Sequence, residues 1–316
     1  MSFSKEAFQV IVLGCSGGPK EDNLSSYLIA PIHSNDFIAL DAGSLLSGID
    51  KAYKKGSFKG ISEESSNPWQ IEPYILRDKV KAYFISHAHL DHVLGLVINS
   101  TEDIKKPIFA IDSAIDFLRD HLFNWKIWPN FASEGNPPLL NLYEYQRLEL
   151  ERKIFVPNTE MSVQPFLLSH SRNYESTAFL VESKGFYALY FGDTAPDILE
   201  PRKYMENVWK KIAPLVQSRS LRGIFLECSY VDKEESQLFG HLDVKHMMRE
   251  LRHFACIVNP ISPQEALKGL KVIIIHMKGD SLKGDFSKEL IRIELDRQND
   301  LGIEFILPEQ GDRIEL

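Results

Sequence analysis

Short apolar runs recur along this chain of 316 residues, and most have the length and the β-branched composition of buried strands. Longer segments between them begin with helix signals such as Ser44 and Pro201. We expect strands at 8–13, 26–30, 37–40, 80–85, 107–111, 161–168, 176–181, 187–191, 221–226, 270–275 and 302–307, and helices at 44–53, 93–99, 113–121, 201–216, 243–254 and 286–297. This order predicts an α/β protein with sheets inside and helices outside.

The amino-acid composition is consistent with a single globular domain. Apolar residues make up 44% of the chain and charged residues 25%, which is ordinary for a soluble protein. No repeat or linker divides the sequence, so we expect a single domain over 1–316. No apolar run approaches the roughly 18 to 20 residues that a membrane span needs.

The net charge and the cysteine content indicate which binding partners and which cell compartment to expect. The net charge is −8 and no run of five basic residues occurs, which argues against an extended nucleic-acid partner. Three cysteines fit no metal or redox motif, and an odd number suits a reducing compartment, so we expect a cytoplasmic protein. Residues 8–15 also resemble a short signal segment with a lipid-attachment cysteine, but a strand followed by a turn is the better interpretation.

Metal-binding residue types follow several of the expected strands. His87, His89, Asp91 and His92 follow the strand at 80–85, and His170, Asp193 and His276 follow later strands. Strand ends meet at one edge of a sheet, so these side chains can converge. A single histidine in such a place is more often a helix cap or a satisfied polar residue. Core packing does not explain the whole set, because buried ionisable groups are costly unless they are paired or bound to metal.

The spacing of these residues predicts two ions. His87 and His89 are two positions apart in an extended segment, so they project to the same side and can bind one ion. Asp91 and His92 point differently and can bind a second ion. Residues further along the chain could complete the two sites. His170 could bind the first ion and His276 the second, and Asp193 could bind both ions through its two carboxylate oxygens. Zinc suits these ligands, with manganese or iron as alternatives, and two ions sharing a hydroxide are a device for hydrolysing phosphoesters.

The motif His87-Ala-His89-Leu-Asp91-His92 resembles the HxHxDH signature of the metallo-β-lactamase superfamily. The other motifs of that superfamily are matched in order by Asp41, His170, Asp193 and His276. The resemblance implies an αββα sandwich with the metals at one edge. It also implies two ligand sets: His87, His89, His170 and Asp193 for the first ion, and Asp91, His92, Asp193 and His276 for the second. Asp41 would support the histidine loop without binding metal.

Flanking segments narrow the resemblance to the class II cyclic-nucleotide phosphodiesterases. Residues 89–100 resemble the extended signature of that family, and 13–19 and 121–130 resemble two further segments. Thr101 departs from the small residue that is usual there. The resemblance implies hydrolysis of 3′,5′-cyclic AMP, and sometimes cyclic GMP, to the 5′-monophosphate. A small cyclic nucleotide is therefore the expected partner, and a homodimer is left open.

A catalytic acid is implied by a second resemblance. Gly240-His241-Leu242 resembles the box that supplies a catalytic histidine in phosphodiesterases of the superfamily. A bridging hydroxide would attack phosphorus, and His241 would protonate the leaving 3′ oxygen. Glu227, at the end of its own strand, would orient and charge His241, and Asp91, His241 and Glu227 are the candidate catalytic residues. The competing interpretation of His241 is a helix N-terminal residue before Asp243.

Several alternatives stay open at this point. The aromatic segment 122–138 either lines a purine site or packs on the fold, and packing is favoured for most of it. Residues 16–18 either offer backbone N–H groups to a phosphate or permit a tight turn. A ribonuclease Z-like enzyme shares the metal motifs, but the acidic balance and the N-terminal motif count against it. A non-catalytic cyclic-nucleotide sensor is the third possibility, and the complete set of candidate ligands argues for turnover instead.

Overall fold

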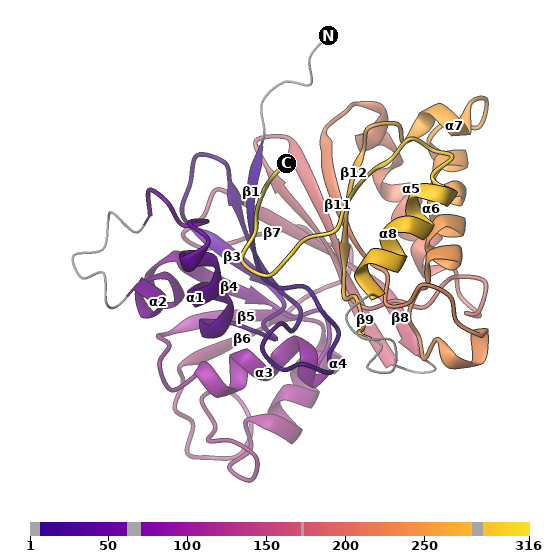
Figure 1. Ribbon diagram of the computed structural model, residues 1–316. Helices are drawn as coiled ribbons and strands as arrows, with labels where there is room; N and C mark the ends of the chain where they lie inside the picture. The colour runs from indigo at the N-terminus through magenta and orange to yellow at the C-terminus, as the bar shows by residue number, and fades with distance from the viewer. Residues whose placement is uncertain (1–6, 62–70, 172–173, 280–286) are drawn as a thin grey trace.

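Two seven-stranded sheets lie face to face, with helices on their outer sides (Figure 1). This computed structural model describes residues 7–61, 71–171, 174–279 and 287–316. Aromatic side chains join the two sheets across the core: Tyr27 lies 5.6 Å from Phe225 and Phe84 lies 5.5 Å from Phe179, between ring centroids. The predicted αββα sandwich is confirmed.

Each sheet is mixed, and each contains a run of parallel strands. The first sheet contains, in spatial order, β14 (Arg313–Glu315), β1 (Phe8–Gly14), β2 (Ser26–Pro31), β3 (Phe37–Leu40), β4 (Val80–Phe84), β5 (Lys106–Ala110) and β6 (Tyr143–Arg147). The second contains β13 (Glu304–Ile306), β12 (Lys271–Ile275), β11 (Leu221–Glu227), β10 (Phe186–Phe191), β9 (Tyr174–Ser183), β8 (Ser162–Ser171) and β7 (Ile154–Phe155). Parallel strands end at the same edge, which is where the candidate site forms.

Helices cover the outer face of each sheet (Figure 1). Beside the first sheet lie α1 (Leu46–Lys54), α2 (Ile71–Tyr74), α3 (Leu90–Asn99) and α4 (Asp112–Phe117), and beside the second lie α5 (Tyr204–Gln217), α6 (Val244–Val258), α7 (Pro263–Ala266) and α8 (Ser287–Gln298). Short π-helical turns at Ile75–Lys79 and Leu118–Leu122 and a 3₁₀ turn at Glu235–Gln237 complete the described elements. None of the described helices has both the length and the apolar content to cross a membrane.

The structure confirms the predicted strands and the principal helices, with shifts at their ends. The expected helix at 93–99 begins at Leu90, so two candidate ligands lie in its first turn. The helix expected from Pro201 begins at Tyr204. The helix expected over 286–297 is observed over Ser287–Gln298, and residue 286 lies outside the described residues. Strands β6, β7 and β14 were not predicted.

Candidate metal centre

The buried carboxylate of Asp41, directly after β3, holds the histidine loop in place. Its oxygens accept hydrogen bonds from the Ser86 amide and hydroxyl, each at 2.7 Å, and from the Tyr190 hydroxyl at 2.6 Å. The Nδ1–H of His92 also donates to Asp41, at 2.8 Å. This bond fixes the imidazole tautomer and leaves Nε2 of His92 facing the centre, which is the arrangement that metal-binding histidines adopt.

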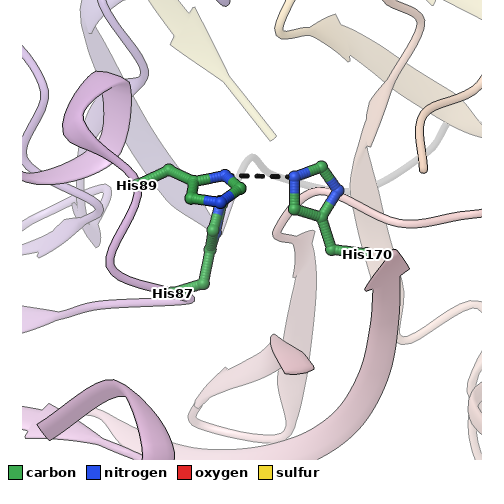
Figure 2. Close-up of side chains that lie close together, drawn as sticks. All are labelled: His87, His89 and His170. Atoms are coloured by element: carbon green, nitrogen blue, oxygen red, sulfur yellow. Dashed lines mark hydrogen bonds between the residues drawn. The ribbon is translucent and has the colours of Figure 1, made fainter. Parts of the chain in front are cut away.

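Three histidines from two sheets meet in a first group (Figure 2). His87 and His89 come from the loop after β4, and His170 comes from the end of β8. Nδ1 of His89 lies 3.1 Å from Nε2 of His170, and candidate ligand atoms of all three lie within 4.8 Å of one another. Burial lowers the pKa of His87 well below its usual value and that of His170 to about 4. Both rings are therefore neutral at pH 7, the form that binds metal.

A second group lies beside the first. Nε2 of His276, directly after β12, is 3.1 Å from the carboxylate of Asp91 and 3.2 Å from that of Asp193. Nε2 of His92 is 3.3 Å from the other oxygen of Asp193. The same Asp193 carboxylate is 3.7 Å from Nε2 of both His87 and His170. Asp193, two residues beyond β10, therefore lies between the two groups.

The orientation of the rings shows that the donor set fits divalent cations. The Nδ1 atoms face supporting groups: Ser86 beside His87 at 3.0 Å, Asp41 beside His92, the Gly240 carbonyl beside His170 at 2.9 Å, and Ser229 beside His276 at 2.9 Å. Within the described part of the chain, the Nε2 atoms of His87 and His92 are buried and make no hydrogen bond of good geometry, although the Asp193 carboxylate lies within 3.7 Å of both. Unsatisfied buried nitrogens are costly, and a bound cation satisfies them. All seven predicted ligands are brought together.

His241 lies against both groups. Its ring centroid is 4.7 Å from that of His170 and 4.9 Å from that of His276. Its Nδ1–H donates to Glu227, the last residue of β11, at 3.1 Å. Burial opposes protonation of His241, but the charge and hydrogen bond of Glu227 outweigh it, so the pKa of His241 is raised. The N-cap of α6 (Val244–Val258) is Asp243, whose carboxylate accepts from the amide of His246, and His241 lies two residues before it.

A tight turn at residues 238–241 lies against His170 and ends at His241. The His241 amide donates to the Leu238 carbonyl at 3.1 Å, and the two central residues, Phe239 and Gly240, have φ of 51° and 81°. Two positive φ values are typical of a type I′ turn. A Cβ at Gly240 would overlap the backbone carbonyl of His170, so only glycine fits there. The turn brings the Gly240 carbonyl to Nδ1 of His170 and places His241 beside it.

Comparison with known proteins now identifies the chain. The family model of the class-II cAMP phosphodiesterases matches residues 7–311. The chain belongs to this family. It is 40% identical to a probable 3′,5′-cyclic-nucleotide phosphodiesterase of Yersinia pestis, over 98% of this chain and 90% of that protein. It is 38% identical to a 3′,5′-cyclic-nucleotide phosphodiesterase of Aliivibrio fischeri, over 99% of this chain and 95% of that protein. The resemblance seen in the sequence is confirmed.

Solved structures confirm the fold of this family member. Unliganded yeast PDE1 superimposes with a TM-score of 0.86 at 22% identity, covering 99% of this chain and all of that one. A metallo-β-lactamase fold protein of Bacillus subtilis superimposes with a TM-score of 0.62 at 14% identity, covering 98% of this chain and 100% of the other. The αββα sandwich of the metallo-β-lactamase type is thereby confirmed.

The structure bears on two of the open alternatives. In the turn after β1, the amides of Ser16 and Gly17 already donate to the carbonyls of Asn23 and Met277. A Cβ at Gly17 would overlap the His276 ring, so glycine permits the turn to lie against that histidine. In segment 122–138, Phe123 is fully buried and the Trp128 indole donates to Ser100 at the C-terminal end of α3. Packing accounts for these residues.

Sequence reasoning missed two residues around the candidate metal centre, Tyr174 and Ser229. Tyr174 stacks on His89, with centroids 4.5 Å apart and planes at 23°, and on its other side lies parallel to Phe117. Ser229 links His276 to Glu227, because its hydroxyl donates to Glu227 at 2.7 Å. Neither residue type indicates such a role by itself. The only signal is position, since Ser229 lies two residues beyond Glu227 at a strand end.

Proposed function

We propose that this class-II phosphodiesterase hydrolyses 3′,5′-cyclic AMP, and also cyclic GMP, to the 5′-monophosphate with two divalent cations. The observation that carries the proposal is the pair of adjacent donor groups with Asp193 between them, and with the ring of His241 against both. Relatives named 3′,5′-cyclic-nucleotide phosphodiesterases support the substrate class. A Dictyostelium discoideum relative named a cAMP/cGMP phosphodiesterase, 30% identical over 98% of this chain, supports the inclusion of cyclic GMP.

The two donor groups define which residues would hold the cations. One cation would bind His87, His89, His170 and Asp193, and the other would bind Asp91, His92, Asp193 and His276. Imidazole and carboxylate ligands together favour zinc, and manganese or iron also suit them. When bound, such a pair neutralises charge on phosphoryl oxygens and lowers the pKa of a water molecule so that it can attack at neutral pH.

His241 would supply the proton that the leaving 3′ oxygen needs. A ribose alkoxide is a poor leaving group, so its departure requires a general acid with a pKa near the working pH. Glu227 raises the pKa of His241, which favours the protonated form, and orients the ring, because Nδ1–H points at the carboxylate. The Glu227 carboxylate is itself held by the Thr194 amide at 2.9 Å. The chain thus supplies an oriented proton donor beside the phosphate site.

Product analysis tests this function. Metal-replete protein is incubated with cyclic AMP, cyclic GMP and bis(p-nitrophenyl) phosphate, and the products are separated by chromatography. We expect 5′-AMP and 5′-GMP, without the 3′ isomers. Turnover of the artificial diester alone would overturn the cyclic-nucleotide assignment, and binding of cyclic nucleotide without turnover would favour a sensor.

A matched pair of histidine variants tests the proton donor. His241→Ala should abolish turnover and retain the metal content measured by atomic absorption. His33→Ala is the control, because His33 is an exposed histidine that pairs with Glu160 at 2.8 Å outside the site, and it should retain both properties. Loss of metal together with turnover in His241→Ala would contradict the role assigned to His241.

A further inference from the structure

Phe239 is an exposed aromatic residue immediately beside the candidate metal centre. Its side chain is 71% exposed, and its ring stacks on no other aromatic side chain among the described residues. Its backbone has a φ of 51°, a left-handed conformation that favours glycine or asparagine and that strains a bulky residue. An exposed apolar ring on a strained backbone brings no stability from packing.

The turn that carries Phe239 is hydrogen-bonded to His241 through Leu238 and to His170 through Gly240. Leu238 before it is buried, and the Leu238 carbonyl accepts from the His241 amide. Gly240 after it accepts from His170 and has no room for a side chain. The Cα of Phe239 lies within about 7 Å of that of His241, because only Gly240 lies between them. The backbone of Phe239 is therefore held near His170 and His241.

We propose that Phe239 stacks on the purine of the bound cyclic nucleotide and so selects nucleotides over base-free phosphodiesters. The inference rests on the proposed function, in which the cyclic phosphate lies between the donor groups and His241. The base is joined to that phosphate through the ribose, so it extends beyond the metal centre toward the rim. Stacking on an aromatic ring accepts any flat base.

Two other aromatic side chains, Tyr174 and Trp125, are less suited to this contact. Tyr174 is covered on both faces, by His89 at 4.5 Å and by Phe117 at 5.5 Å between ring centroids. Trp125 is 43% exposed, but its indole donates to Pro138 within the segment anchored at the far end of α3. That end is about 15 Å from His89, the length of a ten-residue helix. Phe239 combines exposure with proximity to His241.

Kinetics with three substrates test the inference. The substrates are cyclic AMP, cyclic GMP and methyl riboside 3′,5′-cyclic phosphate, which keeps the reacting ring and lacks a base. For Phe239→Ala we expect KM for both nucleotides to rise about tenfold while kcat is retained, and KM for the base-free substrate to be unchanged. Phe239→Trp should restore the wild-type KM. Phe155→Ala, which removes a phenylalanine that is 84% exposed on β7, should change nothing.

Each contrary result has a distinct meaning. If wild-type protein hydrolyses neither cyclic nucleotide, the proposed function fails. If it does and Phe239→Ala leaves KM unchanged, or raises KM equally for the base-free substrate, only the stacking role fails. Light scattering on the same samples completes the test. A change of oligomeric state in Phe239→Ala with KM unchanged would assign the ring to contact with a second copy of the chain and would overturn the inference.

Discussion

Replacing Gly240 with alanine should damage the site far more than it damages the fold. The added methyl would overlap the backbone carbonyl of His170 in β8. Real Cβ atoms stay at least 3.0 Å from such an atom, so either the turn or the strand must move. The move separates the Gly240 carbonyl from Nδ1 of His170 and displaces His241, which follows Gly240 directly.

The size of both effects can be worked from the structure. The substitution requires a shift of more than about 1 Å, and a misplacement of that size can cost on the order of a hundredfold in rate. Left-handed backbone costs alanine about 1 to 2 kcal/mol. Loss of the hydrogen bond to His170 adds about 1 kcal/mol. We therefore expect a loss of at least roughly a hundredfold in kcat/KM and about 2 to 3 kcal/mol in the free energy of unfolding.

Gly185 provides a matched control within the same chain. It also has a φ of 81°, follows a residue with a φ of 51°, and connects β9 to β10. No heavy atom of the residues that the structure describes lies within 4 Å of a Cβ added there. Gly185→Ala should lose only the backbone contribution in urea unfolding and keep full activity on cyclic AMP. Equal losses of activity in the two variants, or none in either, would refute the overlap argument.

Three further predictions concern charge and metal. Glu227→Gln should move the alkaline limb of the pH profile of kcat to lower pH. Glu227 raises the pKa of His241, so its loss lowers that pKa. A general acid acts while it is protonated, so activity is lost as pH rises through its pKa. Lys106→Met should lower the free energy of unfolding in urea by about 3 to 5 kcal/mol, because it leaves the buried carboxylate of Asp103 without its cation. Removing metal with a chelator should lower the melting temperature of the protein, and added zinc should restore it. A cation that binds only the folded state stabilises that state by about 2.7 kcal/mol when its concentration is a hundred times Kd. An unchanged melting temperature would contradict a bound cation.

The sequence indicates much of the candidate site because its residues follow strands with clear apolar runs. β4 and β12 are buried over nearly their whole length, so residues after them stand out as polar at a strand end. His170 shows the limit of this pattern, since β8 continues through it to Ser171. Tertiary pairing with β9 extends the strand beyond its apolar residues.

Elements at the sheet edges were harder to predict. β6 alternates buried Tyr143 and Tyr145 with more exposed residues, a weak period of two within a polar segment. β7 has two residues, and β14 has three and depends on pairing with β1. Such short strands form because a neighbouring strand offers unpaired backbone groups, and this information lies far away in the chain. The stacking of Tyr174 on His89 depends on the same long-range assembly.

The division of the donor groups between the two sheets has a consequence for folding. His87 to His92 belong to the first sheet, whereas His170, Asp193 and His276 belong to the second. Because the candidate ligands come from both sheets, a bound cation would contact its full set of ligands only after one sheet has docked on the other. Contacts of such large sequence separation form slowly. Metal uptake during refolding would therefore report the docking of the two sheets. In a growing cell, only molecules whose sheets have already docked would bind cations.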